Sequence, residues 1–113
     1  MGRQYLISAQ AEPLRTVAFG GIGAAYAVLG APLANPSRLI IFTNDTDADV
    51  TVSLDGVDDH FIILKQSFKL LDIATNKSVQ DGFYFRQGTQ FYQKRTAGAP
   101  STGSLYFETI FAG

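Results

Sequence analysis

The stretch of the chain from residue 37 to residue 59 places the strongest constraint on the fold. It opens with the apolar run 39–42 (LIIF), passes through the polar residues 44–49 (NDTDAD) and resumes as the alternating run 50–54 (VTVSL). Successive side chains of a strand point to opposite faces, so the two valines and Leu54 are expected to share one face. Two strand-like runs separated by a polar turn predict a β-hairpin.

Further short runs of strand-forming residues follow along the chain, at 61–64, 67–73, 83–86, 89–95 and 103–111. No run carries the apolar spacing of a full-length helix. With the extended segments before residue 37, we count about eight short strands, and two packed sheets bury so many alternating faces economically. The sequence therefore predicts an all-β fold, an antiparallel β-sandwich.

Three of these runs carry more specific expectations. The runs 83–86 and 89–95 are separated by Gln87-Gly88 and are expected to form a second hairpin, in which Gly88 supplies a positive φ. In the last run, Leu105, Phe107, Thr109 and Phe111 are expected on one face, with the residues between them on the other.

The chain has the length of one domain, 113 residues, and we expect a single all-β domain over 1–113. Residues 37–113 are expected to form the sandwich core. Residues 1–36 contain only three charged side chains, and the run 16–37 contains none. Because glycines dilute this run and Pro32 and Pro36 end it, we expect an extended N-terminal arm covered by protein rather than a membrane span.

The composition limits the classes of function. Only 17% of the residues are charged, against about 25% in a typical domain, and the net charge is −1, so little repulsion keeps copies or partners apart. The chain has no cysteine, which excludes disulfides and thiolate metal sites. A lightly charged surface of this kind suits contact with other proteins.

Acidic residues and one histidine are the candidates for chemistry. The run 45–49 (DTDAD) matches the start of a calcium-binding loop, but Val50 stands where glycine is required and Gly56 where a bidentate glutamate is required. His60 is the only histidine, and no motif pairs it with a nucleophile or a metal. We therefore expect no catalytic, cofactor-binding or metal-binding residue, and no enzymatic activity.

Nucleic-acid binding is a rival interpretation, because aromatic and basic residues interleave between 83 and 95. Alternate aromatics are needed for the core, which would leave Tyr84 and Tyr92 pointing outward beside Arg86 and Lys94. A net charge of −1 provides no basic field for phosphates. We therefore expect no nucleic-acid partner. A domain that binds single-stranded nucleic acid is kept as the third alternative, after two protein-binding functions.

Residues 37–113 resemble the small cement, or decoration, proteins of tailed-bacteriophage capsids, which are built on a jelly-roll β-sandwich. The resemblance is carried by residues 41–46 (IFTNDT), 52–61 (VSLDGVDDHF), 68–72 (FKLLD), 82–84 (GFY) and 103–107 (GSLYF). It implies a non-enzymatic virion protein on the capsid exterior, assembled in the host cytoplasm. Its partner would be the major capsid protein, it would bridge neighbouring coat subunits, and it would act as a homodimer. A tail or fibre-attachment adaptor is the alternative.

The residues themselves suggest where such an interface would lie. Aromatic anchors and extended apolar segments are typical of protein interfaces. On this ground the uncharged arm and the outward tyrosines are the candidate interface residues: Tyr26, Val28, Leu29, Leu33, Tyr84 and Tyr92.

Overall fold

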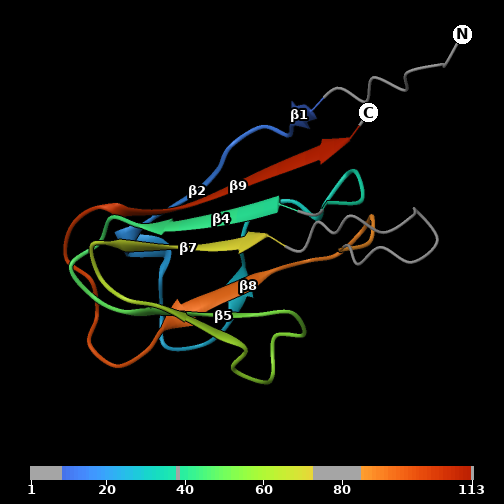
Figure 1. The fold of residues 1–113 in the computed structure, drawn as a ribbon. Helices are drawn as coiled ribbons and strands as arrows, with labels where there is room; N and C mark the ends of the chain where they lie inside the picture. The colour runs from blue at the N-terminus through green and yellow to red at the C-terminus, as the bar shows by residue number, and fades with distance from the viewer. Residues whose placement is uncertain (1–8, 38, 73–84, 113) are drawn as a thin grey trace, which may run out of the picture.

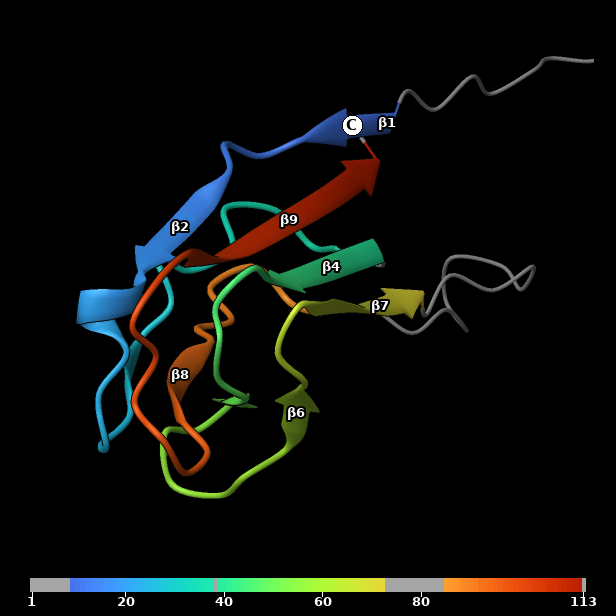
Figure 2. The same cartoon turned by 90° about the vertical axis from the view of Figure 1, so that its left-hand side faces the viewer.

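The protein folds as two antiparallel β-sheets packed face to face (Figures 1 and 2). The structure is a computed structural model that describes residues 9–37, 39–72 and 85–112. The five-stranded sheet contains β1 (Ala9–Ala11), β2 (Arg15–Ala18), β9 (Ser104–Ala112), β4 (Leu39–Asn44) and β7 (Ser67–Asp72). The four-stranded sheet contains β3 (Ala27–Val28), β8 (Tyr92–Arg95), β5 (Val50–Ser53) and β6 (Phe61–Ile63). A 3-10 turn, η1 (Phe19–Gly21), follows β2. The all-β sandwich predicted from the sequence is confirmed.

The order of the strands is that of a jelly roll. Strands β1 and β2 both pair with β9, so they act as one interrupted strand. Counted in this way the described residues form eight strands, and the two sheets read first-eighth-third-sixth and second-seventh-fourth-fifth. Successive strands therefore alternate between the sheets except where β5 and β6 pair, which is the double Greek-key arrangement.

The hairpin predicted for residues 39–54 is wrong, because its two arms lie in different sheets. β4 pairs with β7 and β9, whereas β5 pairs with β6 and β8. The chain crosses between the sheets at Asn44, whose fully buried amide donates to the carbonyls of Ala48 and Ile63, each at 2.9 Å. Alternation along a strand sets its two faces, but it does not identify the neighbouring strand.

The second predicted hairpin is corrected in the same way. Residues 83 and 84 lie outside the described residues, while Phe85 bridges to Ser37 instead of pairing with β8. β8 pairs with β3 and β5. Gly88 does adopt the predicted positive φ, +89°.

The core between the sheets is built around three phenylalanine rings. Phe42, Phe91 and Phe107 are almost fully buried, and their ring centroids lie 4.9–5.5 Å apart. These are the separations at which aromatic pairs attract beyond simple area burial. The predicted faces of β9 are confirmed at Leu105, Phe107 and Thr109, all of which are buried.

The N-terminal segment does not form a separate arm over its described part. Residues 9–36 supply β1, β2 and β3, and Ile22, Leu29 and Leu33 belong to the core. The boundary expected at residue 36 therefore does not divide the structure. The described residues contain no helix of the length and apolar character needed to cross a membrane.

A buried ion pair fastens this segment to the sandwich. The Arg15 guanidinium donates to the Glu12 carboxylate at 2.8 Å and to the carbonyls of Ala31 and Pro32. Glu12 also accepts hydrogen bonds from the backbone N–H groups of Ala34 and Asn35. Burial raises the pKa of Glu12, but the hydrogen bonds from Arg15 and the 34–35 backbone outweigh it and lower that pKa below its ordinary value. Two of the few charges in this segment thus neutralise each other inside the fold.

Candidate protein interface

Three of the predicted interface residues meet on the outer face of the four-stranded sheet. Tyr92 lies opposite Val28 in the ladder between β3 and β8, and Tyr26 immediately precedes β3. Val28 is 55% exposed, while Tyr26 and Tyr92 are half-buried. The structure therefore brings Tyr26, Val28 and Tyr92 together on one side of the molecule.

The predictions for Leu29 and Leu33 as surface anchors are wrong. Leu29 is 0% exposed and Leu33 is 2% exposed. Their backbone N–H groups donate to the carbonyls of Phe91 and Thr89, so the segment after β3 continues alongside residues 89–91 and turns both leucines into the core. Tyr84 lies outside the described residues.

The outer face of the four-stranded sheet is covered in part by the loop 54–60 between β5 and β6. Gly56 lies against the Tyr92 ring, close enough that a Cβ there would come within 3.3 Å of it. Tyr26 donates its hydroxyl proton to Asp59, which also pairs with Lys94 at 3.4 Å. The Lys94 ammonium lies 4.6 Å from the centroid of the Tyr26 ring. The tyrosines and the lysine on this face therefore bind parts of the same chain.

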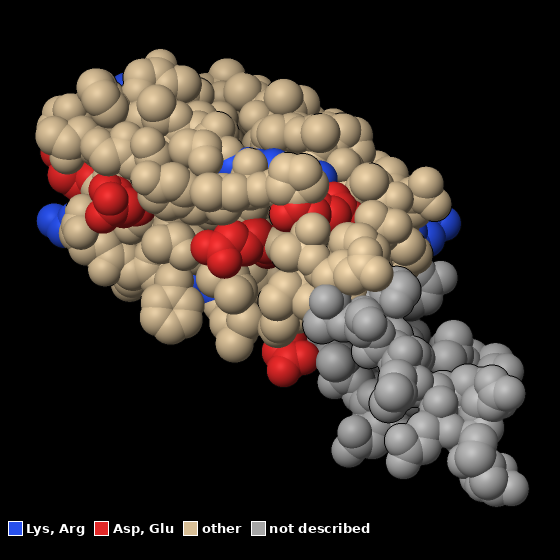
Figure 3. Space-filling view, turned by 90° about the horizontal axis from the view of Figure 1, so that it is seen from above, with Lys and Arg blue, Asp and Glu red and all other residues tan. Residues whose placement is uncertain are grey.

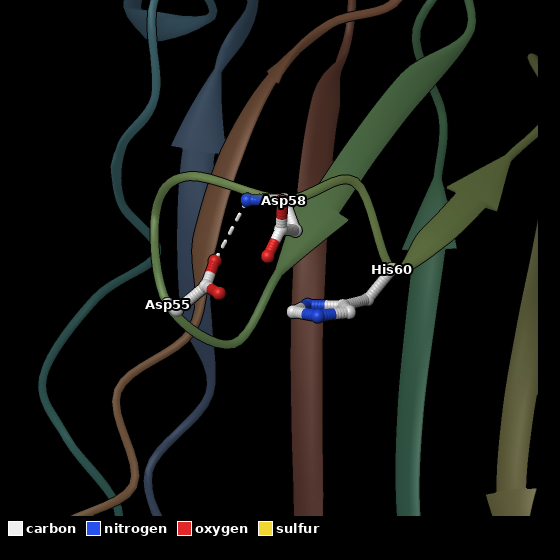
Figure 4. A group of neighbouring side chains, drawn as sticks. All are labelled: Asp55, Asp58 and His60. Carbon is white, nitrogen blue, oxygen red and sulfur yellow. Dashed lines mark hydrogen bonds between the residues drawn. The ribbon is translucent and has the colours of Figure 1, made fainter.

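The loop 54–60 also gathers Asp55, Asp58 and His60, whose ligand atoms lie within 4.8 Å of one another (Figure 4). Asp55 accepts hydrogen bonds from the Ser53 hydroxyl and from the backbone N–H groups of Val57 and Asp58 at 2.8–2.9 Å. These bonds hold the pKa of Asp55 well below its ordinary value. His60 Nδ1 accepts the N–H of Leu54 at 2.9 Å. Asp55 and His60 therefore both accept hydrogen bonds that stabilise the conformation of the loop 54–60.

The acidic run 45–49 fastens neighbouring loops. Asp47 accepts the backbone N–H of Ser101 at 2.7 Å, and Asp49 accepts that of Lys65 at 2.9 Å. The two carboxylates therefore serve different segments, which is consistent with the mismatch to a calcium-binding loop noted in the sequence.

The outer face of the five-stranded sheet is different, and the sequence analysis did not single it out. On three of its neighbouring strands, Thr43 stands between Phe68 and Tyr106, and Ile41 stands between Leu70 and Glu108. Phe68 is 67% exposed and Leu70 is 48% exposed. We call this surface the apolar face and define it by Ile41, Thr43, Phe68, Leu70 and Tyr106.

Figure 3 views the molecule from the side on which β1, β2 and β9 lie in Figure 1. Most of the described surface in this view is uncharged, with acidic groups scattered across it. Contiguous exposed apolar surface is uncommon on soluble monomers and marks interaction sites. Because Phe68 and Leu70 are exposed beside Ile41 and Thr43, the apolar face is the stronger candidate interface.

The edge strand β7 explains why this face is apolar. Phe68 and Leu70 alternate with Lys69, so the usual pattern would bury the apolar pair and expose the lysine. In the structure the opposite side of β7 faces inward: Lys69 stands opposite the buried Phe42, and Leu71 packs against the core. An inward-pointing charge on an edge strand is a recognised protection against edge pairing. The sequence shows that Phe68 and Leu70 share one face of the strand, but it does not show whether that face points to the core or to solvent.

A hollow of about 350 Å³ opens at one end of the apolar face. Thr43, Phe68 and Tyr106 line it from the three strands, and Asp45 and Gln66 line it from the adjoining loops. It combines aromatic walls with one carboxylate.

Comparison of the chain with family models, with curated proteins and with solved structures found no match.

Proposed function

We propose that this protein is a non-enzymatic virion structural protein that binds the outside of a phage capsid and bridges neighbouring coat subunits. The observation that carries the proposal is the apolar face, where Phe68 is 67% exposed and Leu70 is 48% exposed on a sheet of paired strands. The resemblance of residues 37–113 to jelly-roll decoration proteins supplies the class of partner, the major capsid protein.

The physical properties of the apolar face suit a bridging role. A face on three hydrogen-bonded strands is held rigid, so its side chains lose little further freedom on binding. Many copies of a modest interface on one shell produce avidity, and binding only to the assembled shell stabilises that shell by mass action. A homodimer would present this face twice and span two coat subunits.

Binding to assembled coat-protein shells tests the proposal. The purified protein is mixed with shells and sedimented, and the bound fraction is measured against protein concentration. We expect saturable binding by the wild-type protein and a loss of at least about tenfold in affinity for the double variant Phe68→Ser/Leu70→Ser, because it removes the apolar contact. The matched control, Ile62→Ser/Val57→Ser, makes the same type of change at two exposed residues, 45% and 76%, outside the apolar face.

The two possible failures of this experiment are distinct. Binding to no part of the virion would overturn the proposal altogether. Binding to tails or fibres in place of shells would favour the adaptor alternative, and quantification against the coat protein would then find only a few copies per particle.

A further inference from the structure

The hollow on the apolar face has the form of a slot between two aromatic rings. Thr43 on the central strand β4 forms its floor, with Phe68 opposite on β7 and Tyr106 opposite on β9. Because a threonine stands between two larger side chains, the space above it is open. The hollow holds about 350 Å³, which is enough for one long side chain.

The width of the slot is set by the sheet. Strands β7 and β9 are two strand spacings apart, about 9–10 Å. A flat group in contact with a ring on each side at about 3.5–4.0 Å requires rings about 7–8 Å apart. The strand spacing therefore leaves room for one planar group between the positions of Phe68 and Tyr106.

One end of the slot carries the Asp45 carboxylate, and the backbone of Asp45 is held in place. The Asp45 backbone N–H donates to the carbonyl of Ser104 at 2.9 Å. Gly103, with a φ of +85°, approaches so closely that a Cβ there would lie 1.9 Å from the Asp45 carbonyl oxygen. The Asp45 carboxylate makes no hydrogen bond or ion pair with any residue in the ranges 9–37, 39–72 and 85–112. It is exposed and lines the hollow.

The mouth of the slot is also held in place. Gln66 has a φ of +55°, a backbone conformation uncommon outside glycine, and its side-chain amide donates to the carbonyl of Thr46 at 2.9 Å. No lysine or arginine is among the described residues that line the hollow. A cationic group entering the slot would therefore meet an acceptor and no competing cation.

We propose that this slot binds one arginine side chain of the partner protein. The guanidinium lies flat between Phe68 and Tyr106, and its N–H groups donate to the Asp45 carboxylate. Arginine suits the site better than lysine because its guanidinium is planar, stacks on aromatic rings, is weakly hydrated and pairs with a carboxylate through two parallel hydrogen bonds. That the arginine belongs to a coat subunit rests on the proposed function, whereas the chemistry of the slot does not.

Titration of the full chain with a short peptide, followed by NMR, tests the slot directly. The probes are acetyl-Gly-Arg-Gly-amide and the same peptide with citrulline, which is similar in shape and uncharged. We expect saturable shifts at Thr43, Phe68 and Tyr106 with the arginine peptide and at least fivefold weaker binding of the citrulline peptide. Equal affinity for the two peptides, or shifts confined to other residues, would overturn the proposal.

Variants locate the charge that matters. Asp45→Asn removes the carboxylate and is expected to lower the affinity for the arginine peptide at least fivefold. Phe68→Leu removes one of the two aromatic rings, and we expect a similar loss of affinity. The matched control is Glu108→Gln, which removes an exposed acid from the same side of β9 but outside the hollow, and we expect it to bind as wild type. Equal losses in Asp45→Asn and Glu108→Gln would mean general charge attraction and would contradict the slot.

The sedimentation experiment separates this inference from the proposed function. Loss of shell binding in Asp45→Asn, with wild-type binding in Glu108→Gln, supports both. If the protein binds the arginine peptide but does not bind shells, the result supports the arginine-binding slot and overturns the proposed capsid role. Shell binding that Asp45→Asn leaves intact overturns the slot in this role. If Asp45→Asn instead converts a dimer into a monomer by light scattering, the arginine comes from a second copy, and its assignment to the coat is wrong.

Discussion

The outer faces of the two sheets share a fold but differ in what covers them. On the four-stranded sheet, the loop 54–60 lies against Tyr92 and binds Tyr26 and Lys94 through Asp59. On the five-stranded sheet, Phe68 and Leu70 remain largely exposed. The chain's own loop therefore already binds the aromatic and basic residues of one face, whereas Phe68 and Leu70 on the other face stay exposed.

The two faces also differ in how their polar groups are satisfied. Ser53 is fully buried under the loop 54–60, donates to Asp55 and accepts the N–H groups of Asp55 and Gly56. Buried polar groups of this kind stabilise a fold only while every partner is present. The exposed side chains of the apolar face, Phe68 and Leu70, place fewer such demands on the fold. Four predictions test this contrast, from the largest expected effect to the smallest.

Gly103→Ala should give the largest effect, because it disturbs the backbone that shapes the end of the apolar face. Residue 103 has a φ of +85°, and the added Cβ would lie 1.9 Å from the carbonyl oxygen of Asp45. Strain and clash together should lower the free energy of unfolding by at least about 2 kcal/mol, measured by urea denaturation. The control is Gly98→Ala, where no atom lies within 4 Å and the change should stay within about 0.5 kcal/mol. Equal stability of the two variants would contradict the close approach.

Ser53→Ala tests the covered face. The change leaves the N–H groups of Asp55 and Gly56 without their acceptor, so we expect a loss of about 1–3 kcal/mol in the free energy of unfolding. Ser101→Ala, at an exposed serine that donates to Asp47, should have a smaller effect, below about 1 kcal/mol. Shell binding by Ser53→Ala should remain at the wild-type level, and a specific loss there would assign the covered face to the interface.

Acid should weaken the loop 54–60 through Asp55. Hydrogen bonds from Val57, Asp58 and Ser53 lower the pKa of this carboxyl, so it stabilises the fold fully above its unfolded pKa of about 3.9. That contribution is lost as the pH falls further, toward the lowered folded pKa. The urea concentration at the unfolding midpoint should therefore decrease as the pH is lowered below about 4. This decrease should be less steep in Asp55→Asn.

Part of the acid dependence should persist in Asp55→Asn, since the pKa values of Asp47 and Asp59 are also lowered by their hydrogen bonds. Identical pH profiles for the variant and the wild type would show that the Asp55 contacts contribute nothing to stability.

Phe68→Ala should have the smallest effect on stability. The side chain is 67% exposed, so we expect a change within about 0.5 kcal/mol in the free energy of unfolding. Tyr92→Ala is the comparison on the other face and should lose at least about 1 kcal/mol, because Gly56 packs on its ring. A large loss in Phe68→Ala would mean that the apolar face serves folding rather than binding.

The sequence was sufficient wherever local backbone geometry decided the outcome. The two-residue period placed Val50 and Val52, and likewise Leu105 and Phe107, on the buried side. Gly88 adopts the positive φ expected from its place in a turn. Among the candidate interface residues, Tyr26, Val28 and Tyr92 do lie on one surface.

The sequence was insufficient wherever contacts between distant segments decided the outcome. A hairpin was predicted from the apolar run before residues 45–49 and the alternating run after them. In the structure the chain crosses to the other sheet at Asn44, so the two runs lie in different sheets. Leu29 and Leu33 resemble surface anchors in an uncharged segment, yet hydrogen bonds to residues 89–91 turn them inward.

Alternation by itself determined that this chain makes two-faced strands and hence a sandwich. Only the tertiary structure decided which strands pair, that Phe68 and Leu70 point outward while Lys69 points inward, and which outer face the loop 54–60 covers. The physical reason is the range of the interactions. The direction of a side chain follows from its own backbone, whereas its burial depends on which distant segment packs against it.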